Sequence, residues 1–307
     1  MRSRNTLALV PLLSRFRFVG VVVVLVALAS VTRHAVAQDL FVADNNVGNI
    51  ERITPGGAVS TFVTGFTNPR NLVFGNTGDL FVTDNGSGLV SRIAPGGGVS
   101  PYGSGFSNPQ GLAFGSGGSL YIADPGNSRI ARIPSGGGMP VTFAPISSIL
   151  GIALDSANAV YASDSANGVI IKIAGGNATT FATGFTTPFA LAFNSAGDLF
   201  VGNYGGTTIS RVTPAGVVSI YATGINSPIS MAFSSSGDLF VGVNDGTNRV
   251  LKVTTTGTVS NFATVSSVPT GLAFNNVAVP ESGSLALALT GIIAGVVAVA
   301  RRKKAVS

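Results

Sequence analysis

Between residues 39 and 276 the apolar positions fall in short runs that alternate with polar residues or are rich in Val, Ile and Phe. In the stretch 78–117 these runs cover residues 79–83, 89–94, 99–103 and 111–114, separated by clusters of Gly, Asn, Asp, Ser and Pro. Alternation is typical of half-buried strands, and the residues between the runs are those that form tight turns. No window has the 3.6-residue spacing of an amphipathic helix. The stretch therefore predicts four short antiparallel strands and an all-β fold.

The same pattern recurs at nearly constant spacing. The aromatic residue of the first strand returns at steps of 40, 40, 40, 39 and 40 residues, at Phe41, Phe81, Tyr121, Tyr161, Phe200 and Phe240. A basic residue follows each aromatic by eleven or twelve positions, at Arg52, Arg92, Arg132, Lys172, Arg211 and Lys252. The copies run approximately over 39–77, 78–117, 118–157, 158–196, 197–236 and 237–276. Four antiparallel strands make one propeller blade, and such a blade must stack on its neighbours, so six copies predict a six-bladed β-propeller.

The phase of the repeat predicts how the ring closes. The first copy enters at Asp39 without a preceding Gly-Leu-Ala-Phe run, and the last copy ends with a surplus run of this kind at 271–274. We therefore expect residues 272–274 to pair with residues 40–43 and to complete the first blade as its innermost strand. This pairing would remove an open sheet edge that invites aggregation.

The copies resemble NHL repeats. The residues that carry the resemblance are the Leu-aromatic-Val/Ile-x-Asp strands ending at Asp44, Asp84, Asp124 and Asp164, the Asn-x-Arg-Ile run at 127–130 and the Gly-Leu-Ala-Phe strands. Over 39–276 the region also resembles gluconolactonase- and regucalcin-like six-bladed propellers. The latter resemblance implies a divalent cation near the channel, held by carboxylate and Asn ligands, with an acidic residue to handle the proton.

The acidic residues do not fit that cation site. Glu51 and Glu281 are the two glutamates of the chain, the first in a strand of the repeat and the second near the C-terminus. Asp155 occupies a turn position, so Asp245 is the one plausible loop carboxylate. A hard cation such as Ca²⁺ takes several oxygen ligands with carboxylates among them. We therefore predict no metal, no cofactor and no catalytic residue.

The first 37 residues have the pattern of a secretory signal peptide. Basic residues precede the apolar run 18–29, and Ala35 and Ala37 form a small-x-small cleavage site before Gln38. As a helix the run is about 18 Å long, shorter than the ~30 Å core of a bilayer, so we favour a signal peptide over an anchor.

Residues 277–307 form a separate tail. An apolar segment at 285–300 is followed by a basic cluster that we expect to remain cytoplasmic, at Arg301, Arg302, Lys303 and Lys304. With Pro280 and Glu281 ahead of it, this tail resembles the PEP-CTERM sorting signal, although Ser282 stands where that family usually has Pro. The resemblance implies processing by an exosortase and delivery from the inner membrane to the cell surface or exopolysaccharide matrix of a Gram-negative bacterium. The alternative is an ordinary C-terminal anchor helix, which also leaves the propeller outside the inner membrane.

Charge and composition exclude several classes of site. The chain carries +6, but residues 38–280 hold nine Lys and Arg against eleven Asp and Glu, a net of −2, so nucleic-acid binding loses its main support. The chain has no Cys, and its one histidine, His34, lies in the signal peptide. Disulfides, Cys/His metal sites and a Ser-His-Asp triad are therefore excluded from the predicted mature domain.

Residues repeated in every blade are expected to hold the blades together. For the repeated basic residues we expect a solvent-facing position or a pairing with neighbouring blades. A ligand site needs residues that break the symmetry, on the face that carries the loops between blades and after the Leu-Phe-Val strand. The candidates for a carbohydrate or protein ligand are Asn45, Asn46, Arg70, Asn71, Gln110, Phe189, Tyr204, Asn244 and Asp245.

These features predict a secreted, surface-sorted, non-catalytic propeller that acts as a binding or structural module of the cell surface or exopolysaccharide matrix. Two alternatives remain open: a metal-dependent gluconolactonase-like hydrolase and a membrane-tethered periplasmic sensor.

Overall fold

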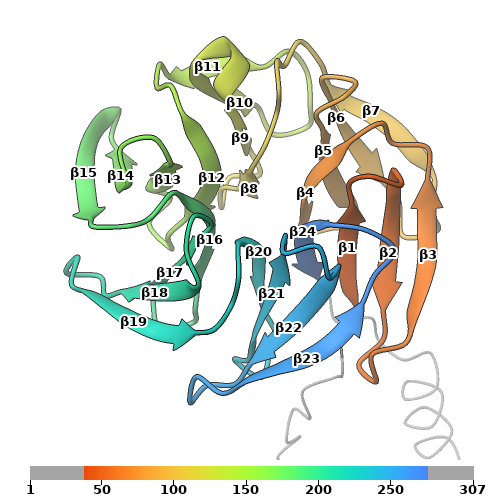
Figure 1. The fold of residues 1–307 in the computed structure, drawn as a ribbon. Coiled ribbons are helices and arrows are strands. Elements are labelled where there is room, and N and C mark those ends of the chain that lie inside the picture. Colours follow the sequence, from red (N-terminus) through yellow and green to blue (C-terminus); the bar gives the residue numbers. More distant parts are fainter. Residues whose placement is uncertain (1–37, 276–307) are drawn as a thin grey trace, which may run out of the picture. The chain divides into compact units, whose positions relative to one another are not determined.

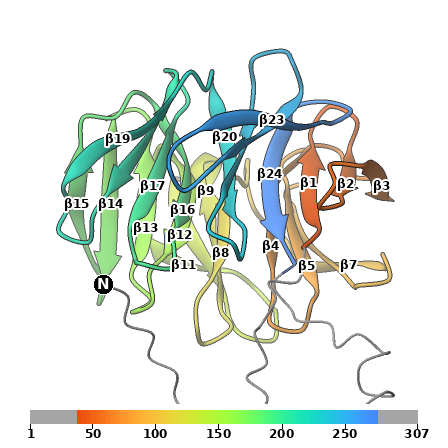
Figure 2. The same ribbon diagram turned by 90° about the horizontal axis from the view of Figure 1, so that it is seen from below.

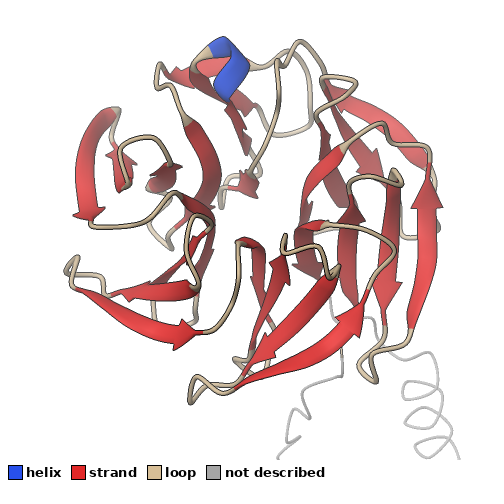
Figure 3. Ribbon diagram, in the orientation of Figure 1, coloured by secondary structure: helices blue, strands red, loops and turns tan. Residues whose placement is uncertain are grey.

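The computed structural model describes residues 38–275, which form a ring of six four-stranded antiparallel sheets (Figure 1). Figure 3 shows that the region is almost entirely strand and loop, with a single short 3₁₀ turn, η1 (Pro125–Asn127). The predicted signal peptide, membrane helix and sorting tail lie outside the described residues. Within residues 38–275 no helix has the length and apolar character needed to cross a membrane.

Each sheet forms one blade, and the strands of each blade are given below from the innermost to the outermost. Blade 1 contains β24 (Pro269–Phe274), β1 (Leu40–Asp44), β2 (Asn49–Ile53) and β3 (Val59–Thr64). Blade 2 contains β4 (Pro69–Phe74), β5 (Leu80–Asp84), β6 (Leu89–Ile93) and β7 (Val99–Gly103). Blade 3 contains β8 (Leu112–Phe114), β9 (Leu120–Asp124), β10 (Arg129–Ile133) and β11 (Val141–Ala144). Blade 4 contains β12 (Ile149–Leu154), β13 (Val160–Asp164), β14 (Val169–Ala174) and β15 (Asn177–Thr183). Blade 5 contains β16 (Pro188–Phe193), β17 (Leu199–Asn203), β18 (Thr208–Val212) and β19 (Val218–Thr223). Blade 6 contains β20 (Pro228–Phe233), β21 (Leu239–Val243), β22 (Arg249–Val253) and β23 (Val259–Thr264).

Burial decreases from the second strand of a blade outward. All five residues of β1, β5, β13, β17 and β21 are buried, because neighbouring blades cover both faces of these strands. The outermost strands, such as β3, are mostly exposed. This gradient explains why the Leu-Phe-Val runs are almost wholly apolar while the outer runs alternate with Ser and Thr.

An aromatic cluster packs neighbouring blades together. The ring of Phe41 in blade 1 contacts Phe62 of the same blade and Phe74 of blade 2, edge to face, with ring centroids 5.0 and 5.2 Å apart. Edge-to-face pairs of this kind add about 0.5–1.5 kcal/mol to the free energy of apolar burial. The arrangement recurs between other blades, and Leu154 takes the place of the third ring beside Tyr121. The repeated aromatic is therefore the packing unit of the ring.

The ring closes as the phase of the repeat predicts. β24 pairs antiparallel with β1, in the register Leu40↔Phe274, Phe41↔Ala273 and Val42↔Leu272. The two ends of the described chain are also tied by a hydrogen bond from Gln38 Nε2 to the carbonyl oxygen of Asn275, at 3.2 Å. The last strand of the repeat is therefore the innermost strand of blade 1.

Five of the six repeated basic residues form ion pairs within their own blades, so the expected pairing with neighbouring blades was wrong. The expected solvent-facing position is confirmed for Arg52, Arg92 and Arg211, whose side chains are exposed. Arg92 on β6 forms an ion pair of 2.8 Å with Asp79, which directly precedes β5 of the same sheet. Arg211 and Asp198 form the equivalent pair in blade 5, at 2.7 Å. The Gly-Asp turn places the carboxylate beside the third strand, and the ion pair clamps the lower end of the blade.

Candidate functional site

The two faces of the ring differ in the loops that they carry. The upper face, uppermost in Figure 2, carries the loops between blades, such as 65–68, and those between the second and third strands, such as 85–88. The inner strands begin at this face and run downward, as β24 shows in Figure 2. The lower face carries the remaining loops and both ends of the described chain.

The inner strands surround a central channel of about 990 Å³. Its wall is formed by apolar and small residues of β4, β8, β12, β16, β20 and β24, with Asn71 and Ser230 among the polar positions. Among the described residues that line this channel, none has an ionisable side chain. The wall therefore offers amide, hydroxyl and backbone groups, and no acid or base for proton transfer.

This wall does not fit the divalent cation that the gluconolactonase-like resemblance implies. Such a cation requires several convergent oxygen ligands that include carboxylates. Among residues 38–275 no three acidic or histidine side chains come together in a way that could hold a metal ion. The carboxylate of Asp245 is engaged elsewhere, in an ion pair of 3.0 Å with Arg249 at the start of β22. Burial tends to raise the pKa of Asp245, but hydrogen bonds from Thr247 and Arg249 outweigh it and hold the pKa below its usual range.

The upper mouth of the channel is where the sixfold symmetry breaks. At the start of the inner strands, six equivalent positions hold six different side chains, those of Arg70, Gln110, Leu150, Phe189, Ile229 and Thr270. The next position is small in most blades because it packs against the neighbouring backbone: a Cβ on Gly151 would collide with the carbonyl oxygen of Phe189. The inner strands are thus closely packed at the mouth, and this backbone frame holds the variable side chains in fixed positions.

Four of the predicted residues come together at this mouth, and we call them the mouth cluster: Arg70, Phe189, Tyr204 and Asn244. The rings of Phe189 and Tyr204 in blade 5 are tilted by 45° with centroids 5.7 Å apart. Asn244 in blade 6 donates a hydrogen bond from Nδ2 to the Tyr204 hydroxyl oxygen, at 2.9 Å. Arg70 is the second residue of β4, the inner strand of blade 2 on the opposite side of the ring, and lies near enough to Tyr204 to interact with it electrostatically. All four side chains are half-buried, so they combine a fixed position with an accessible surface.

The other predicted residues form hydrogen bonds to neighbouring residues of the ring. Gln110 is buried and donates from Nε2 to Asn108 Oδ1 at 2.5 Å. The side chain of Asn71 accepts a hydrogen bond from the backbone N–H of Leu72, at 2.7 Å. The backbone N–H groups of Asn45 and Asn46 bond to Val268 and Ser267, across the closing seam of the ring.

A pair of buried carboxylates lies at this seam and was not predicted. Asp44 at the end of β1 and Glu51 on β2 are both buried, and they accept hydrogen bonds from Ser267 and Ser266 respectively. Asp44 Oδ2 is buried without a hydrogen-bond partner. Burial, together with the charge of Glu51, raises the pKa of Asp44 to about 6. The available signal was a glutamate at a position that holds Ser91, Ala131, Ile171, Ser210 or Leu251 in the other blades.

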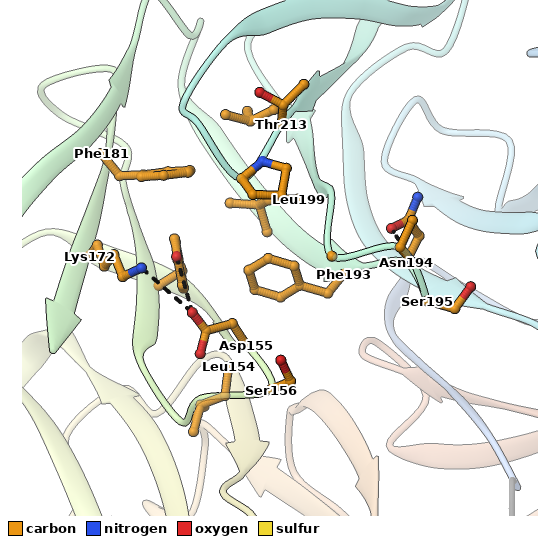
Figure 4. Close-up of a pocket in the computed structure, with 15 residues that line it drawn as sticks. Leu154, Asp155, Ser156, Lys172, Phe181, Phe193, Asn194, Ser195, Leu199 and Thr213 are labelled. Carbon is orange, nitrogen blue, oxygen red and sulfur yellow. Dashed lines mark hydrogen bonds and ion pairs between the residues drawn. The ribbon is translucent and has the colours of Figure 1, made fainter.

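A second pocket, of about 400 Å³, lies between blades 4 and 5 at the lower face (Figure 4). Its charged groups are Lys172 and Asp155, whose Nζ and Oδ2 atoms are 3.6 Å apart. The Tyr161 hydroxyl donates to the same carboxylate at 3.2 Å. Contact with Tyr161 raises the pKa of Lys172, which keeps the ammonium charged. Blade 4 has Ala159 where blades 1, 2, 5 and 6 have the aspartate of the ion pair, and here Asp155 pairs with the repeated basic residue instead.

Comparison with known proteins supports the fold. The model of the NHL repeat family matches residues 106–133. No curated protein matches the chain. A chain in a solved structure of a nidogen/laminin complex is 18% identical in sequence to this protein. Its TM-score is 0.70, and the match covers 78% of this chain and 98% of that chain. A streptogramin B lyase is 19% identical, with a TM-score of 0.61 over 76% and 83%. A gluconolactonase from Xanthomonas campestris is 14% identical, with a TM-score of 0.60 over 66% and 78%. The chain is thus a six-bladed propeller that carries an NHL repeat.

Proposed function

We propose that this propeller is a non-catalytic binding module of the cell surface or exopolysaccharide matrix, and that it holds a carbohydrate ligand at the upper mouth of its channel. The observation that carries the proposal is the mouth cluster. Its two half-buried aromatic rings occupy repeat positions that hold no aromatic residue in the other five blades. The amide of Asn244 is hydrogen-bonded to one of them, Tyr204. Flat aromatic faces and fixed hydrogen-bonding groups are what a sugar ring requires, with its apolar face and hydroxyl edge.

The two ends of the sequence support the surface location. The signal-peptide pattern up to Ala37 routes the chain through the export machinery, and the tail with Pro280 and Glu281 makes it a substrate for an exosortase. Before processing, the segment 285–300 would hold the precursor in the inner membrane with the propeller on the periplasmic side. This order of events places a rigid propeller with low net charge among surface polysaccharides.

The alternative of a lactonase-like hydrolase has less support. The fold is shared with a gluconolactonase and a streptogramin B lyase, but at identities below 20% this likeness concerns architecture alone. The channel wall carries no ionisable side chain, and Asp245 is paired with Arg249.

A binding screen with matched variants tests the proposal. Affinity electrophoresis of the full chain through gels that contain neutral or acidic polysaccharides should retard the wild type in at least one of them. Phe189→Ala and Tyr204→Ala should each weaken that binding about tenfold, equivalent to ~1.4 kcal/mol. Val217→Ala, a change at an exposed apolar residue of the lower face, should leave it unchanged. Binding that is absent from the whole panel, or equal in all variants, would overturn the proposal.

A further inference from the structure

Arg70 is one of two cations left without an acidic partner in the part of the chain that the structure describes. Residues 38–275 contain nine Lys and Arg side chains. Seven of these form ion pairs with aspartates of the same region: Arg52, Arg92, Arg129, Lys172, Arg211, Arg249 and Lys252. The exceptions are Arg70 and Arg132, and each has a buried Nε atom with no hydrogen-bond partner among the described residues.

The two exceptions have different origins. Arg132 occupies the clamp position of blade 3 at the lower face, where Ser119 replaces the usual aspartate. Arg70 occupies no repeated basic position, since the equivalent residues are Gln110, Leu150, Phe189, Ile229 and Thr270. Arg70 is thus an additional basic residue at the mouth. Arg132 is instead a repeated basic residue whose usual acidic partner is missing.

The surroundings of Arg70 lack a counter-charge. The neighbouring groups of the mouth cluster are the phenol of Tyr204 and the amide of Asn244, which are hydrogen-bonded to each other, and neither is a carboxylate. The acid next in sequence to Asn244 is Asp245, and its charge is already neutralised by Arg249. Burial lowers the pKa of Arg70, as expected for a guanidinium withdrawn from water without an acid beside it. A desolvated cation of this kind is unfavourable until a bound anion pairs with it.

The side chains of the mouth cluster indicate which class of anion would bind beside Arg70. A guanidinium binds a carboxylate through two parallel N–H···O bonds. The tilted rings of Phe189 and Tyr204 provide an aromatic surface in the same cluster, which suits a sugar ring better than an extended peptide. Residues 38–275 carry nine basic and eleven acidic side chains, so their net negative charge would repel a polyanion. Binding of an acidic polymer would therefore depend on this local site.

We infer that the mouth cluster binds carboxylate-bearing sugars of an acidic polysaccharide, with Arg70 pairing with the uronate carboxylate and Phe189 and Tyr204 packing against the sugar ring. The inference rests on the proposed function, because it names the class of ligand for the same site. Arg70 is the residue that distinguishes acidic from neutral polysaccharides.

The test uses the full chain and five defined polymers: polygalacturonate, alginate, dextran, dextran sulfate and poly-glutamate. Dissociation constants are measured by isothermal titration calorimetry at physiological salt for the wild type, Arg70→Gln, Arg70→Lys and Arg132→Gln. Arg132→Gln is the matched control, because it removes the other unpaired arginine from the opposite face. Thermal unfolding of every variant confirms that the ring is intact.

We expect Arg70→Gln to weaken polyuronate binding at least tenfold, Arg70→Lys to weaken it less, and Arg132→Gln to leave it unchanged. Equal losses in Arg70→Gln and Arg132→Gln would overturn the site assignment. Binding of dextran as tight as that of polyuronate, with no effect of Arg70→Gln, would overturn the inference while the proposed function stands. Tighter binding of poly-glutamate or dextran sulfate than of polyuronate would overturn the sugar carboxylate as the ligand. Failure of all polysaccharides to bind would overturn the proposed function and the inference together.

Discussion

Asp44 and Glu51 are two buried carboxylates on adjacent strands of blade 1, and both hold the loop that leads into the strand that closes the ring. Glu51 accepts a hydrogen bond from the hydroxyl of Ser266, and Asp44 accepts one from the hydroxyl of Ser267. Loss of hydration and the charge of Glu51 together raise the pKa of Asp44 to about 6. The folded protein therefore retains a proton at this seam over a pH range in which the unfolded chain has released it.

This proton makes the stability of the ring depend on pH. The folded state releases it near pH 6, and the unfolded state releases it near 3.8. The contribution of Asp44 to the free energy of unfolding is therefore greatest below about pH 4 and is lost as the pH rises through 6, by up to about 3 kcal/mol. In Asp44→Asn this pH dependence should disappear, and Asn203 at the same position of blade 5 indicates that the frame accepts the amide.

Urea unfolding of the wild type and of Asp44→Asn between pH 4 and 8 checks this expectation. In Glu51→Gln the fall in stability with rising pH should occur at lower pH than in the wild type, because the charge that helps to raise the pKa of Asp44 is gone. Parallel stability curves for the wild type and Asp44→Asn would contradict the assigned titration.

The closing strand should be indispensable for folding. A chain that ends at Ser267 lacks β24 and leaves β1 as an open inner edge beside the channel. We expect this chain to aggregate and to lose cooperative unfolding, because an unpaired edge is a template for association. A chain that ends at Asn276 keeps β24 and should unfold at the same temperature as the full chain. Size-exclusion chromatography and calorimetry distinguish the two, and a monomeric, cooperatively unfolding chain ending at Ser267 would refute the role of the seam.

Blade 3 should be stabilised by the aspartate–arginine ion pair that it lacks. Ser119 stands where Asp79 pairs with Arg92 in blade 2, and Arg132 is left without an acid. Ser119→Asp should stabilise the protein by a few tenths to about 1 kcal/mol, the range for a half-exposed ion pair. Chemical unfolding measures the gain, and the double variant with Arg132→Gln should abolish it. A gain that persists in the double variant would show that the new carboxylate acts without Arg132.

The ends of the chain should be removed during export. We expect protein recovered from the cell surface to begin at Gln38 and to have lost the apolar segment 285–300, because the cleavage site and sorting tail direct both steps. Mass spectrometry of the surface and membrane fractions gives both termini directly. Ala37→Phe should block the first cleavage, since the site requires small residues. Surface protein that retains 285–300 would instead support a permanent anchor and the tethered sensor.

The sequence was sufficient to predict the fold, because the packing unit is itself periodic. Each repeated aromatic, such as Phe41, marks a contact between blades, and the surplus run at 271–274 required the closing pair. The partners of the repeated basic residues were not predicted, since the Arg92–Asp79 pair depends on where the Gly-Asp turn places the carboxylate. The local backbone path, rather than the repeat, decides such pairs.

The site was predicted as a set of candidates but not as a cluster. Arg70 and Tyr204 belong to blades on opposite sides of the ring, so their proximity follows from the diameter of the channel, which no local pattern encodes. Gln110 was grouped with the ligand residues because its position is symmetry-breaking, and the structure places its side chain in the interior, hydrogen-bonded to Asn108. Glu51 was assigned to a strand of the repeat, but its burial beside Asp44 was not predicted, because the sequence alone does not reveal it.

The central claim is that the ligand sits on the upper mouth of the channel. Hydrogen–deuterium exchange of the full chain, with and without a saturating acidic polysaccharide, tests it most directly. The account predicts slower exchange at 188–190, 203–207 and 243–246, with no change at the lower-face loops 155–158 and 194–197. Protection confined to the lower face, in particular around the pocket of Figure 4, would contradict it.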